Sequence, residues 1–357
     1  MKGRMTMIAE VPPLVSVAVP TRNRARRLDR LLGTLAAQEA VSFGWEVIVV
    51  DNGSEDDTEE VVRRHAAGGS IVLRHVFEPR VGLHYGRHRG AREARGLYLA
   101  YLDDDMELST TWIQGVDLLE RRRADAVVGR ILPLWEGRPP AWLRSLVDDG
   151  VYPPLGLLNL GEKRRAVDPL TVFGGNCFLP RRLIFELGGF HPDGFPRERR
   201  RYRGDGETGL MRKFRNSGFR SFYDPAATAY HVVSPERMSE AYLCARAYNQ
   251  GISDSFAYFR DLHGVESGPK PCSRVGRAVE TCRRLPLSDL LRTIRTKVTR
   301  WGRRVVSRRY VDLLRSFRAA YEDGWRYHQR EVDGDPNLLQ YVLREQFLDE
   351  EGAPESS

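Results

Sequence analysis

The chain has 357 residues, of which 41% are hydrophobic and 29% charged, a composition that indicates a globular protein and excludes a largely disordered one. Its length allows one large α/β domain with an additional segment. The formal net charge of +8 favours an anionic partner such as a nucleotide, a phosphate-bearing lipid or a membrane surface. Codon bias toward arginine is the alternative explanation of this charge.

The cysteines and the hydropathy of the sequence indicate the cellular compartment of the protein. The four cysteines are scattered and form no Cys-x-x-Cys pair, which indicates a reducing compartment and no disulfide framework. Residues 1–13 lack the apolar core of a signal peptide, and no run approaches the roughly 18 apolar residues of a membrane span. We therefore expect a cytoplasmic protein whose only membrane contact would be peripheral, at the inner face.

The first part of the chain alternates between apolar runs typical of strands and stretches with helical periodicity. The expected strands are Val15–Pro20, Trp45–Val50, Ser70–Phe77 and Leu97–Leu102, and the expected helices follow Arg24, Thr58 and Gly82. This alternation predicts a doubly wound, Rossmann-like α/β fold, with a mostly parallel sheet flanked by helices. No glycine-rich phosphate loop follows the first strand.

Polar residues stand where three of these strands end. The loop Pro20-Thr21-Arg22-Asn23 follows the first strand, Asp51 ends the second, and Asp103-Asp104-Asp105 follow the fourth. Because ligands bind at the carboxyl edge of such sheets, these residues are candidates for one site. Three adjacent carboxylates repel one another, which a Mg²⁺ or Mn²⁺ ion would relieve. The alternatives are a solvated acidic turn and, for Asp51, an Asx-turn that only closes its loop.

The middle of the chain carries a second acidic stretch. Strands are expected at Ala126–Ile131 and Val172–Leu179, separated by an irregular insertion over 133–170. Asp205 and Glu207 precede an expected helix over 208–217, where the positive end of the helix dipole keeps a carboxylate ionised and available as a base. An ordinary acidic helix start is the alternative.

The last strand material is expected at 220–223 and 226–232, with His231 near its end as either a structural histidine or a ligand. From Glu240 onward the pattern is helical. Residues 268–330 carry 17 Lys and Arg against 5 Asp and Glu, a net +12. Such a segment can lie on an anionic membrane or can pack on the main domain with a solvated basic face. Residues 349–357 are expected to be disordered.

The order of these motifs over residues 14 to about 232 resembles family 2 glycosyltransferases of the GT-A fold. The resemblance is carried by the following stretches of this sequence: Val15–Asn23, Val47–Ser54, Gly82–Gly96, Tyr101–Asp105, Gly174–Phe178, Gly204–Glu207 and Tyr230–His231. Together with the residue patterns on either side of it, the resemblance divides the chain into four parts: an N-terminal extension at 1–13, a GT-A domain at 14–239, a basic helical region at 240–348 and a tail at 349–357.

The resemblance also implies an activity. It is the inverting transfer of a sugar from a nucleoside diphosphate, with uridine diphosphate favoured, to an acceptor hydroxyl, assisted by Mn²⁺ or Mg²⁺. No nucleic-acid partner is implied. The resemblance implies that the donor nucleotide is bound by the following residues: Pro20, Thr21, Arg22, Asn23, Asp51, Arg87, Asp103 and Asp104. It implies that Asp105 and His231 bind the metal and that Gly174, Gly175 and Asn176 contact the acceptor or the sugar. The general base would be Asp205 or Glu207.

Two departures from the family pattern bear on these roles. A glycine separates Asp205 from Glu207 where the family usually has adjacent acids, and we favour Asp205 narrowly as the base. His88 follows Arg87 where the family often has asparagine, which leaves the role of that asparagine in doubt. The alternatives for the function are a nucleotidyltransferase on a similar fold and a non-catalytic nucleotide-sugar-binding relative.

Overall fold

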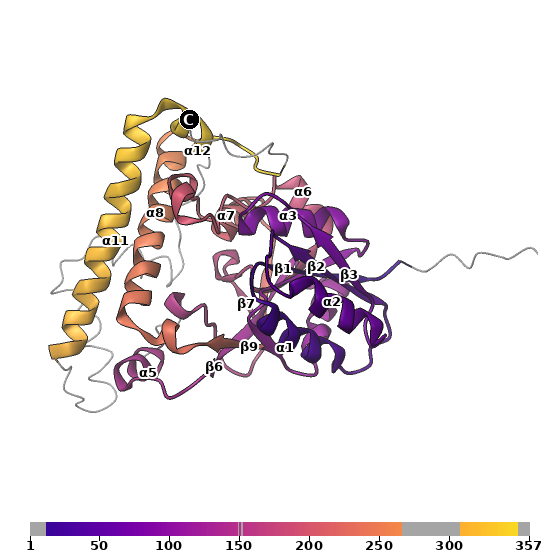
Figure 1. Ribbon diagram of the computed structural model, residues 1–357. Coiled ribbons are helices and arrows are strands. Elements are labelled where there is room, and N and C mark those ends of the chain that lie inside the picture. Colours follow the sequence, from indigo (N-terminus) through magenta and orange to yellow (C-terminus); the bar gives the residue numbers. More distant parts are fainter. Residues whose placement is uncertain (1–11, 149, 151–152, 266–307, 349–357) are drawn as a thin grey trace, which may run out of the picture.

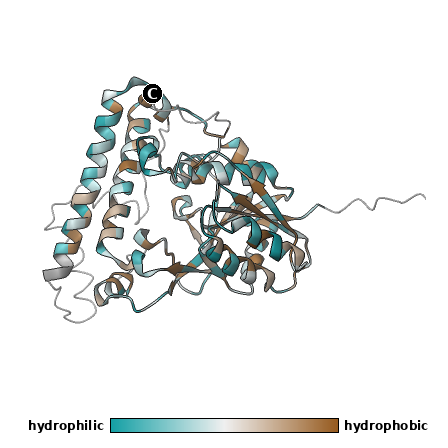
Figure 2. Ribbon diagram, in the orientation of Figure 1, coloured by the Kyte–Doolittle hydropathy of each residue, from teal (hydrophilic) through white to brown (hydrophobic). Residues whose placement is uncertain are grey.

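One mixed sheet organises the molecule. The computed structural model describes residues 12–148, 150, 153–265 and 308–348. Within these residues nine strands form a sheet in the order β3-β2-β1-β4-β8-β6-β9-β5, with β7 paired to β9 (Figure 1). The central strands are mostly brown in Figure 2, whereas the helices around them show both teal and brown, because β1, β2, β4 and β8 are buried on both faces and each helix on one.

The N-terminal part has the alternating order that the sequence predicts. Its elements are β1 (Val15–Thr21), α1 (Ala25–Ala36), β2 (Trp45–Asp51), α2 (Thr58–Ala67), β3 (Leu73–Phe77), α3 (Leu83–Glu93) and β4 (Tyr98–Leu102). β1 pairs in parallel with both β2 and β4, and β2 pairs in parallel with β3. The expected strand at 70–77 begins three residues late, because only residues 73–77 pair with β2.

The strand order reverses between β1 and β4. The chain moves outward from β1 to β3 and then returns past β1 to form β4. Because parallel crossovers are right-handed, this reversal puts α1 and α2 on one face of the sheet and α3 on the other, as Figure 1 shows. Open α/β sheets bind ligands at such a reversal, so the loops after β1 and β4 border the expected binding crevice, here called the β1–β4 crevice.

The remaining strands mix both directions. The elements are β5 (Met106–Leu108), η1 (Trp112–Val116), α4 (Asp117–Glu120), β6 (Ala126–Trp135), α5 (Ala141–Asp148), η2 (Pro153–Leu155), β7 (Arg165–Val167), η3 (Pro169–Thr171), β8 (Asn176–Pro180), α6 (Arg181–Glu186), η4 (Arg197–Tyr202), α7 (Glu207–Asn216), β9 (Ser221–Val233) and η5 (Pro235–Met238). β8 is antiparallel to β4 and to β6, so the sheet is parallel only through its first four strands and in the β6–β9 pair.

Several details of this part differ from the expected elements. β6 extends to Trp135, β8 begins at Asn176 rather than at Val172, and β7 lies within the insertion expected over 133–170. The two strand pieces at 220–223 and 226–232 form one strand, β9, whose pairing with β6 shifts register between Gly129 and Ile131. The short strand β5 was not expected. It pairs with β9 and places Met106 opposite His231, so the acidic triplet lies in a turn between two strands.

The C-terminal helices are α8 (Glu240–Leu262), α11 (Arg308–Gly334) and α12 (Pro336–Val342). α8 and α11 lie side by side at the edge of the molecule away from β3 (Figure 1). Their backbones meet at two glycines: a Cβ on Gly251 would lie 2.1 Å from Tyr321 O, and one on Gly324 would lie 1.9 Å from Tyr248 O. Only glycine therefore permits this close crossing.

The basic region falls mostly outside the described residues. Residues 308–330 carry six of its arginines and three of its acids, while residues 268–307 carry the remaining net +9. Three arginines of α11 pair with acids of the same helix: Arg315 with Asp312, Arg318 with Glu322, and Arg326 with Glu322 and Asp323. No helix in the described part of the chain has the length and low polarity that a membrane crossing requires.

Candidate active site

The loops after β1 and β2 are tied together at the crevice. Asn23 adopts a left-handed backbone conformation with φ 53°, which asparagine tolerates better than most residues. Its Oδ1 accepts a hydrogen bond from Glu55 N at 2.7 Å, and its own N–H donates to Ser54 Oγ at 3.0 Å. Arg22 is exposed beside it, whereas Pro20 lies buried within β1. Asn23 thus shapes the loop.

Asp51 ends β2 opposite Thr21. Its Oδ1 accepts from Ser54 N at 2.8 Å, three residues on, so the carboxylate closes its loop but not through an Asx-turn, which bonds the residue two positions on. Its Oδ2 lies 3.4 Å from His75 Nε2. The neighbouring Asn52 was not among the expected site residues. Its side chain bonds Glu78 O, Arg80 O and Gly82 N, which fixes the entry into α3.

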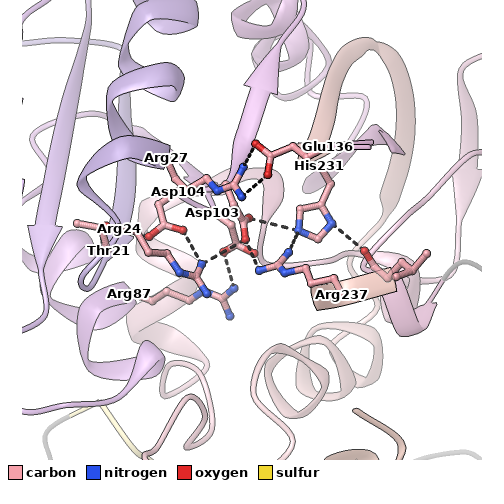
Figure 3. Close-up of polar contacts among 11 residues, drawn as sticks. Thr21, Arg24, Arg27, Arg87, Asp103, Asp104, Glu136, His231 and Arg237 are labelled. Atoms are coloured by element: carbon pink, nitrogen blue, oxygen red, sulfur yellow. Dashed lines mark hydrogen bonds and ion pairs between the residues drawn. The ribbon is translucent and has the colours of Figure 1, made fainter. Parts of the chain in front are cut away.

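The three acids after β4 have different surroundings (Figure 3). Asp103 is partly exposed, at 35% of its side chain, whereas Asp104 and Asp105 are exposed by only 5% and 6%. Asp104 accepts from Thr21 Oγ1 and from Arg24 Nη1, both at 2.8 Å. Burial raises the pKa of Asp104 above its ordinary value, against the charge of Arg24. The Thr21 hydroxyl and the Asp104 carboxylate therefore already bond each other, which argues against the expectation that they bind the nucleotide.

Asp105 instead has basic groups on several sides. Arg237 Nη2 donates to its Oδ2 at 2.6 Å, Arg24 Nη1 lies 3.2 Å from the same oxygen, and His231 Nε2 lies 3.4 Å from Oδ1. Burial alone would raise the pKa of Asp105, but the positive charges of Arg237 and Arg24 hold it well below the ordinary value. Asp105 is therefore a carboxylate, and its oxygens attract cations.

His231 has its imidazole oriented by two contacts (Figure 3). Its Nδ1 lies 2.7 Å from Leu155 O and donates to it, which leaves the lone pair on Nε2. Arg237 Nη1 donates to that Nε2 at 2.5 Å. A backbone carbonyl on one ring nitrogen is the usual support for a histidine that binds a metal through the other. Among the described residues, no group of three or more His, Cys, Asp or Glu side chains could hold an ion.

Arg87 of α3 connects the two acidic stretches. Its side chain is 3% exposed and its guanidinium lies 5.0 Å from the ring centre of Phe190. Nη2 lies 3.4 Å from Asp103 Oδ1, and Nη1 lies 3.3 Å from Glu207 Oε2. Burial opposes the charged form, but Glu207 and Asp103 raise the pKa of Arg87. One buried cation thus brings residues 103 and 207 to the same place.

The glycines before β8 are required by this arrangement. A Cβ on Gly174 would lie 2.6 Å from Arg87 Cζ, and one on Gly175 would lie 2.4 Å from Asp103 Oδ2. Asn176 behaves differently from the expectation. Its amide accepts from Trp112 Nε1 and donates to Arg130 O and Ala227 O, so it is buried with internal partners. This argues against Asn176 as a contact to the sugar.

Residues 204–207, here called the acid loop, hold Asp205 and Glu207 in unlike positions. Asp205 is 4% exposed and its Oδ1 lies 2.6 Å from His191 Nδ1, whereas Glu207 is 27% exposed and opens α7. Gly206 between them has φ 57°, which turns the two side chains apart. The burial of Asp205 argues against our prediction that it is the base, because a base must reach the acceptor.

His88 also has a structural role here. It is buried, its Nε2 accepts from Phe190 N at 2.8 Å, and burial keeps its pKa well below the ordinary value. Sequence reasoning missed three residues that the geometry brings to the site: Arg24, His191 and Arg237. Arg24 follows the strand-end loop directly, which is a local signal, whereas His191 and Arg237 lie in stretches with no pattern of their own.

Comparison with known proteins identifies the family. Residues 16–187 match the family described as Glycosyl transferase family 2. These residues belong to glycosyltransferase family 2. The family resemblance recognised in the sequence is thereby confirmed for this part of the chain.

Several curated glycosyltransferases resemble part of the chain. Validoxylamine A glucosyltransferase of Streptomyces hygroscopicus subsp. jinggangensis is 37% identical over 146 residues, which cover 40% of this chain and 34% of the relative. Glycosyltransferase AglE of Haloferax volcanii is 30% identical over 120 residues, which cover 33% of this chain and 40% of the relative. The matches thus span about a third to two fifths of the length of these relatives.

A solved structure resembles the chain over most of its length. The mannosyltransferase PcManGT from Pyrobaculum calidifontis, in complex with GDP-Man and Mn²⁺, has a TM-score of 0.53 and covers 93% of this chain and 86% of its own. At 20% sequence identity this likeness shows the fold, which is GT-A with a helical C-terminal region.

Proposed function

We propose that this glycosyltransferase moves a sugar from a nucleoside diphosphate to an acceptor hydroxyl with inversion, using Glu207 as the general base. The observation that carries the proposal is the Arg87 bridge. It links Asp103, at the edge of the β1–β4 crevice, to Glu207 at the start of α7. Asp103 on the donor side and Glu207 on the acceptor side both contact the guanidinium of Arg87, so the two acids can act on one sugar from opposite sides.

The donor half of the proposal uses the crevice. Asp51 and Arg22 remain candidates for the nucleoside, since Asp51 Oδ2 has only His75 within ion-pair distance among the described residues. Asp103 is the partly exposed acid of the triplet and is our candidate for the ribose side. Uridine diphosphate remains the favoured nucleotide, and the sugar and acceptor remain open.

A divalent cation fits Asp105 and His231. His231 Nε2 and Asp105 Oδ1 lie 3.4 Å apart. Arg237, which donates to both residues, and Arg24 would have to move aside from these atoms when the ion binds. Mg²⁺ in nucleotide sites is usually held by one or two carboxylates together with substrate phosphates, so a site with few protein ligands is adequate. When bound, Mn²⁺ or Mg²⁺ would offset the charge that develops on the departing diphosphate.

The chain's own residues account for the rest of the reaction. The acceptor oxygen forms a bond to the anomeric carbon while the bond from that carbon to the diphosphate oxygen breaks, and its electron pair leaves with the diphosphate. The acceptor proton passes to the Glu207 carboxylate. Arg24 and Arg237 are positive groups on the donor side, and Arg87 Nη1 contacts Glu207 Oε2 on the acceptor side.

Three variants test these roles. Glu207→Gln removes the base but keeps the shape of the side chain, so turnover should fall by about 10²- to 10⁴-fold while binding of UDP or GDP with Mn²⁺ persists. Asp205→Asn keeps an oxygen beside His191 and should retain most of the activity. Asp105→Ala should lose the metal-dependent part of nucleotide binding.

The assay measures release of nucleoside diphosphate from UDP-glucose, UDP-N-acetylglucosamine and GDP-mannose, with Mn²⁺ or Mg²⁺. Full activity in Glu207→Gln, or loss of activity in Asp205→Asn with Glu207→Gln unaffected, would return the base to Asp205. Release of pyrophosphate would favour the nucleotidyltransferase. Nucleotide-sugar binding with no product from any donor would favour the non-catalytic relative.

Two further proposals concern the rest of the chain. The division at residues 13, 239 and 348 remains our proposed domain boundary, and α8 begins at Glu240. Peripheral contact with an anionic membrane remains a proposal for 268–330, whose excess charge falls mainly in 268–307. Flotation with phosphatidylglycerol vesicles at low salt tests it, and absence of binding would leave the basic face as ordinary solvated surface.

A further inference from the structure

We propose that the C-terminal helical region is part of the catalytic apparatus, because α8 and residues 345–348 hold the acid loop in place through His191. This inference rests on the proposed role of Glu207 and adds a positioning function for residues outside the family match at 16–187. It assigns to the C-terminal region a task distinct from binding an acceptor or a membrane.

His191 contacts the acid loop on its buried side. It is completely buried, and its Nδ1 lies 2.6 Å from Asp205 Oδ1. Its backbone N–H donates to Gly206 O at 3.0 Å. A Cβ on Gly209 would lie 2.0 Å from His191 Nδ1, so the first turn of α7 packs directly on the imidazole. His191 therefore sets where α7, and with it Glu207, begins.

α8 supports the same loop with one hydrogen bond and one ring. Ser253 Oγ donates to Gly204 O at 2.8 Å, directly before Asp205. The ring of Phe256 lies 3.1 Å from the position of a Cβ on Gly204, and its centre is 5.6 Å from that of His191. A polar contact to the backbone and a close ring contact define position better than burial alone.

The residues after α12 also contact the imidazole of His191 and helix α7. Phe347 N–H donates to Gly188 O at 3.2 Å, and the Phe347 ring centre lies 5.0 Å from that of His191. Lys213 of α7 donates to Glu345 O at 2.6 Å. Residues 345–348 thus bind α7 itself as well as the imidazole that α7 packs on.

Asp205 has the properties of a positioning residue. Among the described residues nothing bonds its Oδ2, although the atom is buried. A buried carboxylate with one bonded oxygen is costly, and His191 is the partner that makes it tolerable. The pair therefore couples the C-terminal region to the loop that carries Glu207, without touching substrate.

The experiment compares two serines on one helix. Ser253→Ala removes the bond to Gly204 O, while the matched control Ser255→Ala removes a buried hydroxyl that contacts His328 Nδ1 between α8 and α11. We expect kcat for nucleoside diphosphate release to fall about tenfold in Ser253→Ala, since small displacements of a catalytic group are costly. Ser255→Ala should keep kcat at a similar loss of thermal stability, and both should keep the Kd for UDP and GDP with Mn²⁺.

A second pair of variants tests His191. The amide of His191→Asn can donate from near the Nδ1 position, whereas His191→Leu has no donor. We expect His191→Asn to recover at least a tenth of wild-type kcat and His191→Leu to recover far less. If His191→Leu does not fold, the serine pair still decides the matter.

The outcomes separate this inference from the proposed function. If Glu207→Gln is inactive but Ser253→Ala has the kcat of Ser255→Ala, the positioning role is refuted and the base assignment survives. If Glu207→Gln is fully active, the base assignment fails first. A loss of kcat in both serine variants that follows their loss of stability would also overturn the inference, because it would report general destabilisation.

Discussion

The close crossing of α8 and α11 makes a sharp prediction about Gly251. In Gly251→Ala the new methyl group would lie 2.1 Å from Tyr321 O and 2.7 Å from Trp325 N. Both obstacles are backbone atoms of α11, which no rotamer change can move. The two helices must therefore separate locally by about 1 Å to restore ordinary contact.

The magnitude follows from two opposed terms. Overpacking costs about 1–3 kcal/mol, and the upper part of this range applies because backbone meets backbone. Replacing glycine by alanine within a helix returns about 1 kcal/mol. We therefore expect a net destabilisation of about 2 kcal/mol. Gly33→Ala in α1 is the matched control: no atom lies within 4 Å of the new Cβ, so it should stabilise by about 1 kcal/mol.

Hydrogen exchange of the α8 and α11 amides measures the effect where it arises. Gly251→Ala should raise exchange in both helices, and Gly33→Ala should leave it unchanged. Because α8 supports the acid loop, kcat should fall with Gly251→Ala as well. Wild-type exchange in α8 and α11, together with a stability equal to that of Gly33→Ala, would refute the backbone contact on which the reasoning depends.

Three further results are expected. Burial lowers the pKa of His328 to about 4, below its ordinary 6.5, so its contribution to stability is complete above pH 6.5 and is lost as the pH falls toward 4. Urea unfolding of wild type should thus lose about 2 kcal/mol between pH 7 and pH 5 that His328→Gln does not lose; equal slopes would contradict this. Gly175→Ala, with its Cβ 2.4 Å from Asp103 Oδ2, should weaken UDP or GDP binding with Mn²⁺ in calorimetry; unchanged affinity would show that Asp103 is not used. Arg237→Ala frees Asp105 of one cation and should bind Mn²⁺ about tenfold more tightly in the absence of nucleotide, as read from the electron paramagnetic resonance signal of free Mn²⁺; weaker binding would make Arg237 part of the site.

The sequence alone determined the framework and the positions where chemistry could occur. The apolar runs of β1, β2 and β4 predict buried parallel strands, since a strand covered on both faces has no polar alternation. Their ends then place Thr21, Asp51 and the acidic triplet at one edge of the sheet. Pattern and order were also sufficient for the family, which the comparisons confirm.

Only the tertiary structure decided which partners each of these side chains has. Asp103, Asp104 and Asp105 are indistinguishable as three adjacent letters, but Thr21 and Arg24 take the second, and Arg237 and His231 take the third. These partners lie 80 or more residues away for Asp104 and more than 120 for Asp105, so no local pattern reports them.

The same reason explains the two acids before α7. Asp205 and Glu207 are two residues apart and equally acidic, yet one turns inward to His191 and the other lies partly exposed beside Arg87. The left-handed conformation of Gly206 separates them, and α8 and residues 345–348 enclose the buried side. Composition and periodicity predict which residues can form a site, whereas burial and partners distant in the sequence determine which of them meet a substrate.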